Sequence, residues 1–176
     1  MKTALISLAA ALAVLVPTSV AAQDADAPAA AQFEPGAFRI MPLWSTDPEG
    51  FLAVWGQPTP PTLSTTLSTV RNQPIQQFIL YANCTRNDEG HCHLRARVSI
   101  TGPDGSPYGE EMVFDALPQG VPVVEENHFG LAPNSIGIRV DDDEQVGFYT
   151  VDLEITDVFA GTKAYNTVQI EVTEAP

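Results

Sequence analysis

The clearest pattern in the chain is a two-residue alternation of apolar and polar side chains near the C-terminal end. Between residues 147 and 157 every second position is apolar, at Tyr149, Val151, Leu153 and Ile155. The residues between them are mainly polar or acidic. Successive side chains of a strand point to opposite faces, whereas a helix would scatter these four around its circumference. The pattern therefore predicts a long strand with one face in a core and the other in water.

The same alternation recurs in several other stretches and predicts a domain built from strands. It is found in residues 92–100, 136–140 and 166–172, whereas residues 76–84 are at first apolar on both parities, as expected of a central strand. Weaker strand candidates lie at 62–70 and 112–114, and turn residues such as Gly102-Pro103-Asp104-Gly105 separate the runs. Short strands at regular spacing predict a single all-β sandwich over residues 62–176, and no stretch predicts a helix.

The first 61 residues differ in composition from this domain. Residues 1–22 combine a charged start, an apolar run and small residues, the marks of a secretory signal peptide, and the run is shorter than the about 20 residues of a membrane helix. Residues 23–36 are rich in Ala, Pro and Asp and predict a flexible leader. Residues 37–61 hold two apolar runs around a turn-like Asp47-Pro48-Glu49-Gly50, followed by prolines. They predict a hairpin-like arm and a stiff spacer.

The net charge of the chain limits the classes of partner that we expect. It has 8 Lys and Arg against 22 Asp and Glu, a formal net charge of −14. Nucleic acids and anionic membrane surfaces attract basic patches, so neither is an expected partner. No segment after the signal peptide is apolar enough for a membrane helix, so we expect no membrane insertion. With the signal peptide, this predicts a periplasmic or secreted protein.

Cys84 and Cys92 are the only cysteines of the chain. An even number of cysteines in an exported protein predicts a disulfide. Both cysteines fall on the apolar parity of their runs, on either side of one short turn. We therefore expect them at opposing positions of a hairpin, where Cβ atoms are close enough to be bridged.

From about Phe78 to Val172 the chain resembles a bacterial immunoglobulin-like domain. The stretch Gly147-Phe148-Tyr149-Thr150-Val151 resembles the entry to the penultimate strand of such domains. The resemblance implies that the Tyr149 hydroxyl bonds back to the preceding corner. The run 78–84 and the turn at 102–105 also resemble small exported proteins of Gram-negative bacteria. The resemblance implies an immunoglobulin-like β-sandwich but no catalytic residue, because a fold is not a function.

Two histidines flank the second cysteine and form a candidate metal site. If His91 and His93 project from one face of a strand, their imidazoles can share Cu(II) or Zn(II). His128, Asp88 or Glu89 could add a third ligand. The alternative is a disulfide flanked by two surface histidines at a turn, which needs no metal.

A second candidate cation site is the acidic run Asp141, Asp142, Asp143 and Glu144. Oxygen-rich turns between strands can bind calcium, although this run lacks the ligand spacing of the twelve-residue calcium loop. The alternative is a solvated acidic turn.

No enzyme constellation is evident. The chain has no Gly-x-Ser-x-Gly, His-Glu-x-x-His or phosphate-cradling glycine loop, and no nucleophile can be matched with a base. We therefore expect a protein that is not an enzyme and needs no cofactor. The best candidate for a partner surface is the arm with Trp44, Phe51 and Trp55, because aromatic residues are enriched in interfaces. Alternatively, the arm completes the sandwich with strands of its own.

These features predict a non-catalytic exported binding or cell-envelope accessory module whose partner is an unidentified protein or envelope component. An exposed strand edge that accepts another strand is one route to such a partner. One alternative is a periplasmic copper or zinc protein using His91 and His93. Another is an acidic inhibitor of a cationic, envelope-targeting enzyme, which the net charge favours.

Overall fold

Residues 36–57 and 62–175 are described by the structure, a computed structural model. The predicted signal peptide and nearly all of the predicted leader lie outside the described residues, as do residues 58–61 of the predicted spacer. The elements of the described residues are β1 (Arg39–Ser45), α1 (Pro48–Trp55), β2 (Ser68–Val70), β3 (Ile75–Ala82), β4 (Leu94–Thr101), β5 (Met112–Leu117), β6 (Gly130–Leu131), β7 (Ile136–Ile138), β8 (Gly147–Asp157) and β9 (Lys163–Thr173).

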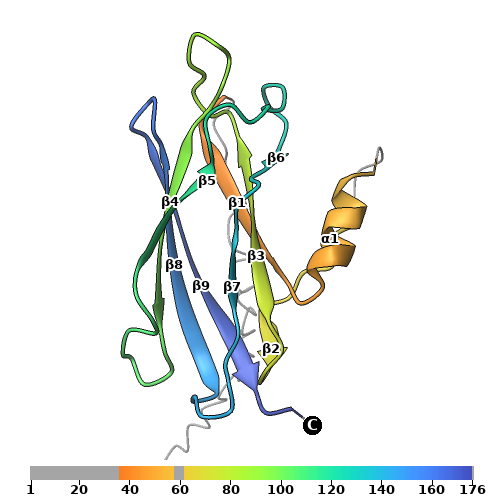
Figure 1. Ribbon diagram of the computed structural model, residues 1–176, viewed down its shortest axis with the longest axis vertical. Helices are drawn as coiled ribbons and strands as arrows, with labels where there is room; N and C mark the ends of the chain where they lie inside the picture. Colours follow the sequence, from red (N-terminus) through yellow and green to blue (C-terminus); the bar gives the residue numbers. More distant parts are fainter. Residues whose placement is uncertain (1–35, 58–61, 176) are drawn as a thin grey trace, which may run out of the picture. The chain divides into compact units, whose positions relative to one another are not determined.

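The strands form two sheets, which confirms the predicted all-β sandwich (Figure 1). One sheet has the order β1-β3-β6, with β7 also paired to β3, and the other has the order β2-β9-β8-β4-β5. Neighbouring strands are antiparallel except for β2, which runs parallel to β9. Because β1 pairs with β3 over seven positions, the first apolar run is a strand of the sandwich.

In β8 the alternation of apolar and polar side chains matches an alternation of buried and more exposed ones. Val151, Leu153 and Ile155 are at most 2% exposed, whereas Phe148 on the other parity is 55% exposed. The inward side chains of both sheets, such as Ile79 of β3 and Leu153 of β8, share one apolar cluster. Burying a side chain of this size contributes about 1.5 to 3 kcal/mol, so this shared cluster is what holds the two sheets together.

The prediction that no helix is present is wrong, because the second apolar run forms α1. Asp47 caps the helix: its Oδ1 accepts the Gly50 N–H at 2.9 Å. Pro48 occupies the first turn, where the backbone N–H it lacks would have no helical partner, and Glu49 faces the positive end of the helix dipole. The Asp-Pro-Glu-Gly sequence fits a type I turn and a helix start equally well, so local chemistry does not separate a hairpin from a helix.

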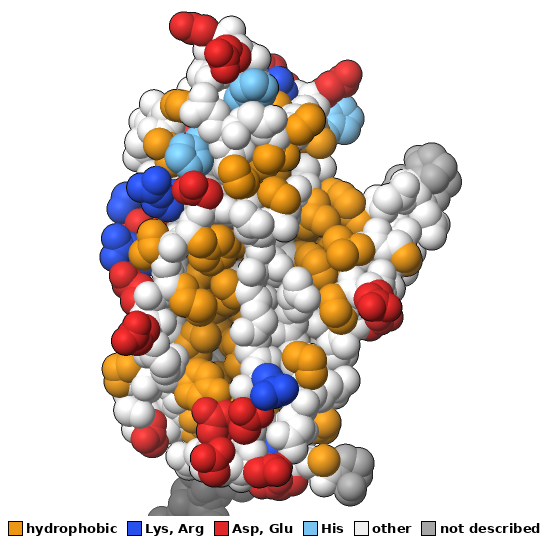
Figure 2. Space-filling view, viewed as in Figure 1, with side chains coloured by type: hydrophobic (Ala, Val, Ile, Leu, Met, Phe, Trp, Pro, Cys, Tyr) orange, Lys and Arg blue, Asp and Glu red, His pale blue; other side chains and the backbone are white. Residues whose placement is uncertain are grey.

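What favours the helix is the outer face of β3, which is as apolar as its inner face. Phe51 of α1 stacks on Phe78 of β3, with ring centroids 3.9 Å apart, and Leu80 lies in the same cluster. Figure 2 shows hydrophobic side chains gathered between the sheets and α1. The helix therefore covers apolar side chains of β3 that would otherwise face water.

The disulfide is confirmed, but its predicted setting is wrong. Cys84 and Cys92 are bonded, with Cα atoms 6.0 Å apart. However, β3 and β4 belong to different sheets and are not a hairpin. The disulfide closes the connection that carries the chain from one sheet to the other. The sequence pattern could not separate the two cases, since alternation on both sides of a short loop fits a crossover as well as a hairpin.

The corner before β8 has the hydrogen bond implied by the immunoglobulin-like resemblance. The Tyr149 hydroxyl donates to the Gln145 carbonyl four residues earlier. Gly147 starts the strand with a φ of 142°, and a Cβ at this position would lie 2.9 Å from Pro103. The glycine is therefore required both by its backbone conformation and by this close approach.

Within the described ranges, no helix has the length and apolar character needed to cross a membrane.

Candidate functional site

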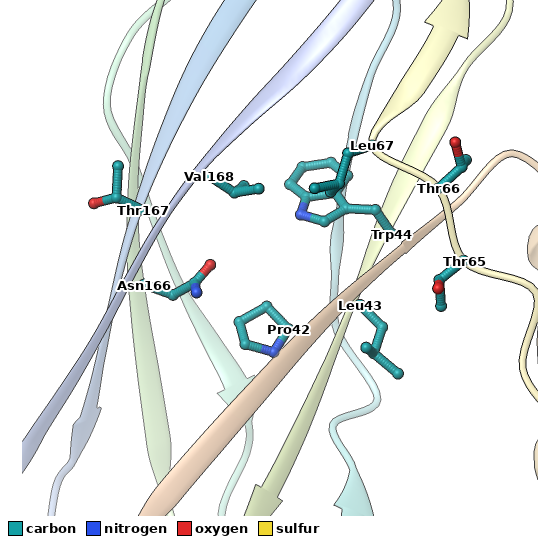
Figure 3. Close-up of a pocket in the computed structure, with 9 residues that line it drawn as sticks. All are labelled: Pro42, Leu43, Trp44, Thr65, Thr66, Leu67, Asn166, Thr167 and Val168. Atoms are coloured by element: carbon teal, nitrogen blue, oxygen red, sulfur yellow. The ribbon is translucent and has the colours of Figure 1, made fainter. Parts of the chain in front are cut away.

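The two sheets leave an opening between the outer edges of β1 and β9, and a groove of about 380 Å³ lies there. It is lined by residues 42–44 of β1, 65–67 of the segment before β2, and 166–168 of β9 (Figure 3). We call it the edge groove. Its lining residues are apolar or uncharged polar ones, so it suits a neutral group with an apolar part.

Trp44 is both a core residue and a lining residue of the edge groove. Its side chain is 2% exposed and belongs to the apolar cluster between the sheets. The indole Nε1 is buried and has no hydrogen-bond partner. In Figure 3 this nitrogen lies on the side of the ring nearer Val168. A buried N–H donor without an acceptor costs about 1 to 3 kcal/mol, so an acceptor that enters the groove would be favoured.

Gln77 adds a second unsatisfied polar group behind Trp44. The two residues are opposite each other in the register of β1 and β3, so both side chains point inward. Gln77 is fully buried, and neither its amide nitrogen nor its amide oxygen has a partner. Buried amides are nearly always hydrogen-bonded. The unsatisfied side chains of Trp44 and Gln77 therefore mark the polar part of an otherwise apolar region.

The outer edge of β1 is partly closed by its own sequence. The Trp44 carbonyl accepts the Thr66 N–H at 2.9 Å, so the backbone of Trp44, and of Pro42 two residues earlier, faces this edge. Pro42 has no N–H to offer a further strand. Ile79, opposite Pro42, directs its carbonyl to the other side, where it accepts the Ala132 N–H at 2.9 Å.

The outer edge of β9 is open along most of its length. Glu171 donates its N–H to the Leu67 carbonyl at 2.8 Å, so the backbones of odd-numbered β9 residues face away from β8. β2 covers this edge only at residues 171–173. Within the described residues, no backbone hydrogen bond reaches the edge over residues 163–169. These seven positions can therefore accept another strand.

One ion pair lies at the start of the open β9 edge. Lys163 Nζ is 2.8 Å from Glu154 Oε1 on β8. The hydrogen bond from Lys163 lowers the pKa of Glu154, and the hydrogen bond to Glu154 raises the pKa of Lys163. Lys163 is exposed and Glu154 is half-buried at the surface, where solvent screens the pair, so it contributes little to stability.

The structure contradicts the expectation that Trp44, Phe51 and Trp55 form an exposed partner surface. Trp44 and Phe51 are 2% and 3% exposed, and Trp55 is half-buried against the cluster that includes Phe51. Trp44 packs between the sheets and Phe51 packs on β3, because burying each aromatic side chain there is more favourable than exposing it to water on an arm. Only Trp44 reaches the candidate groove.

The structure does not bring His91 and His93 together with further ligands. Both precede β4 and lie outside any strand. His93 Nε2 is 2.9 Å from Asp115 Oδ1, an interaction that lowers the pKa of Asp115, whereas His91 Nδ1 is 3.5 Å from Glu89. Across residues 36–57 and 62–175, no group of three or more His, Cys, Asp and Glu side chains could hold a metal ion.

In the acidic turn of Asp141, Asp142 and Asp143, protein groups bind oxygens of Asp141 and Asp142 that could otherwise bind calcium. Arg71 Nη1 donates to the carbonyls of Asp141 and Glu144, both at 2.6 Å. The Asp141 carboxylate pairs with Arg139 at 2.8 Å, and Asn72 donates to the Asp142 carboxylate at 2.7 Å. The guanidinium of Arg71 thus brings a positive charge to this turn through two backbone carbonyls.

Sequence reasoning missed the edge groove. The inward parity of Val168 and the apolar character of Pro42 and Leu67 are visible in the sequence. Their meeting depends on β1 and β9 being the neighbouring edges of two different sheets, which local patterns do not encode. The one available signal was Pro42, since proline within an apolar run indicates an edge strand.

Comparisons with known proteins yield similarity to solved structures only. No protein-family model matches the chain, and no curated protein is significantly similar to it in sequence. The CARDB domain of a Pyrococcus furiosus protein, crystallised in complex with di-metal ions, is similar over 79% of this chain and 94% of its own, with 9% identity and a TM-score of 0.41. The sporulation control protein Spo0M of Bacillus subtilis is similar over 80% of this chain and 51% of its own, with 9% identity and a TM-score of 0.41.

A third similar structure is the alkylpurine DNA glycosylase AlkC of Pseudomonas fluorescens, bound to DNA containing an abasic site analog. The similarity covers 62% of this chain and 28% of the glycosylase, with 11% identity and a TM-score of 0.38. At identities this low, likeness to any of the three concerns the fold alone.

Proposed function

We propose that this chain is an exported, non-catalytic binding or cell-envelope accessory module with an immunoglobulin-like sandwich, and that it holds its partner in the edge groove. The observation that carries the proposal is the buried Trp44 N–H without an acceptor, in a groove beside an open strand edge. A groove with one unsatisfied donor and an unused edge has the parts of a binding site.

Export is supported by two independent features. Residues 1–22 have the composition of a secretory signal, and the disulfide between Cys84 and Cys92 is of the kind that persists in oxidising compartments. If the proposal is right, the mature protein begins after Ala21 or Ala22. Intact-mass measurement of the protein recovered from its producing cells tests this, and a mature chain that still carries residues 1–22 would contradict it.

The binding site is tested by filling the groove. Val168→Arg places a long, charged side chain in the edge groove, whereas Val113→Arg places the same group on the outer face of β5, where Val113 is 54% exposed. Affinity capture from an envelope extract should recover the same partner with the wild type and Val113→Arg, and lose it with Val168→Arg. Capture that is equal for all three proteins would reject the edge groove as the site.

The acidic-inhibitor alternative is a narrower version of this proposal, based on the net charge of −14. It predicts capture that disappears at high salt, because long-range attraction to a basic enzyme is screened. Capture that resists salt favours a module whose contacts are mainly apolar and backbone ones.

A further inference from the structure

We infer that the occupant of the edge groove is an extended, basic segment of a partner protein, which adds to the open edge of β9 as a further strand. The inference rests on the proposed function and goes further, since it names the class of partner and the way it is bound. Backbone hydrogen bonds to β9 would supply the pairing, and the groove would receive alternate side chains of the segment.

The geometry of β9 fits one added strand of about seven residues. β9 is an 11-residue strand, and β2 covers its outer edge only from Glu171 onward. The backbones of Tyr165, Thr167 and Gln169 face the open part of the edge, by the parity that the Glu171 hydrogen bond sets. On the opposite wall, Pro42 has no N–H, so the added strand pairs with β9 and not with β1.

The side chains along the edge set the pattern of the added strand. Asn166 and Val168 of β9 point inward and line the groove, so residues beside them would place their side chains in it. Val168, Pro42 and Leu67 favour apolar side chains there, and the Trp44 N–H donates to any carbonyl or hydroxyl oxygen that comes within reach. The alternate residues face water on the outer face of the β9 sheet.

Charge indicates that the outward residues are basic and that the occupant is not a second copy. The groove has no charged lining residue, but the outer face beside it carries Asp152, Glu154 and Glu171 against Lys163 and, opposite Glu154 on β4, Arg97. The whole chain has a net charge of −14, so two copies repel each other while a basic segment is attracted.

The test uses a defined peptide and the native tryptophan. The probe is acetyl-Lys-Val-Thr-Leu-Lys-Val-Thr-amide, with apolar side chains at every second position. Trp44 and Trp55 are the two tryptophans of the chain, so Trp55→Phe leaves Trp44 as the only one, and its fluorescence reports groove occupancy. We expect saturable binding at least tenfold tighter than that of a peptide with the order Lys-Lys-Thr-Thr-Val-Val-Leu, and at least tenfold tighter than that of the alternating peptide with Glu for Lys.

Backbone methylation of the probe separates strand addition from simple side-chain binding. In a strand, residues of one parity direct their N–H groups to the same edge. N-methylation of Lys, Thr and Lys within one peptide, or of Val, Leu and Val within another, should therefore affect binding very differently. We expect a loss of at least tenfold with only one of the two sets: the first set if the segment runs antiparallel to β9, the second if it runs parallel.

The matching change in the protein is Thr167→Pro, which removes an N–H from the open edge without removing a donor to β8. Thr167→Ala is its control, because it keeps the N–H and loses the hydroxyl bonded to Asp152. Thr167→Pro should weaken probe binding at least tenfold and Thr167→Ala less than threefold.

Each result decides one of the two proposals. Equal effects of the two methylated sets, or equal affinities of the two Thr167 variants, would overturn strand addition while Val168→Arg could still abolish envelope capture and support the groove. Failure of the probe to bind better than its scrambled form would also overturn the inference. Equal envelope capture by the wild type, Val113→Arg and Val168→Arg would overturn the proposed function itself.

Discussion

The two strand edges that flank the groove are built in opposite ways. β1 presents Pro42 to its outer edge and gives its Trp44 carbonyl to Thr66, so its backbone is partly closed. β9 presents free backbone over residues 163–169 and carries only one positively charged side chain there, Lys163. Exposed edges are a hazard for aggregation, and proteins normally block them. One blocked and one open edge across a single groove indicate that the open one is used.

The two walls also differ in what they contribute to stability. The β1 wall includes Trp44, which is buried between the sheets, whereas the β9 wall is formed by half-buried side chains such as Val168. The β1 wall is therefore part of the core, whereas the β9 wall is only partly buried against it. The following variants test this difference.

The largest effect is expected from Trp44→Ala. Removing a buried aromatic side chain should lower the free energy of unfolding by about 3 to 5 kcal/mol, whereas Trp44→Phe keeps most of the buried area and should cost less than about 1.5 kcal/mol. Urea unfolding followed by circular dichroism measures both. A cost for Trp44→Ala as small as that of Val168→Ala would mean that the two walls do not differ.

Removal of the disulfide should affect stability but not the groove. The bridge spans 8 positions of sequence, and the loss of so short a closed loop costs about 2 to 3 kcal/mol in the chain-entropy model. The variant with Cys84→Ala and Cys92→Ala should unfold at lower urea concentration and still bind the alternating peptide as the wild type does. A parallel loss of peptide binding would show that the connection between the sheets, and not the β9 edge, controls the groove.

Gln77→Met should stabilise the protein. The Gln77 amide is buried without a partner, and an apolar side chain of similar shape removes the cost of burying it. We expect a gain of about 1 kcal/mol in the free energy of unfolding, with Gln76→Met on the half-buried outer face of β3 as the control. Destabilisation by Gln77→Met would mean that the amide has a polar partner in solution.

Much of the fold was predictable because burial follows parity. The alternation in residues 147–157 and 166–172 predicted two long strands, and both are found, as β8 and β9. The helix α1 was not predicted, because its local sequence also suits a turn and its position depends on Phe78 and Leu80, which are distant in sequence. The crossover closed by the disulfide was mistaken for a hairpin for the same reason.

The candidate site was less predictable than the fold. The residues chosen from the sequence were conspicuous ones, such as His91, His93 and the acidic run. A groove between two sheets depends on which edges meet, and that is a property of topology. Trp44 was chosen as a surface residue but contributes from inside, as the unsatisfied donor of the edge groove.

Exchanging the proline between the two edges tests their difference directly. Pro42→Thr gives β1 an outward N–H and should change the free energy of unfolding by no more than about 0.5 kcal/mol, since the position lies at an edge. Combined with Thr167→Pro, it should recover a few-fold of the peptide affinity that Thr167→Pro alone loses, because β1 then offers a donor. The Trp44 fluorescence titration measures this, and no recovery would mean that β1 is closed by something other than its proline.

The smallest effect is expected at the ion pair beside the open edge. Lys163→Gln removes the hydrogen bond that lowers the pKa of Glu154, so this pKa should rise toward its ordinary value of 4.5. A carboxylate with a lowered pKa in the folded state contributes stability that is present above its unfolded pKa and is lost as the pH falls through the folded pKa. The wild type and Lys163→Gln should therefore differ slightly in stability near pH 7 and converge in acid, with the carboxyl titration followed by NMR. If the affinity for the peptide falls as well, the Lys163 side chain takes part in binding the peptide. If only the pKa of Glu154 moves, the peptide binds through the open backbone of β9, which is the property that distinguishes β9 from β1.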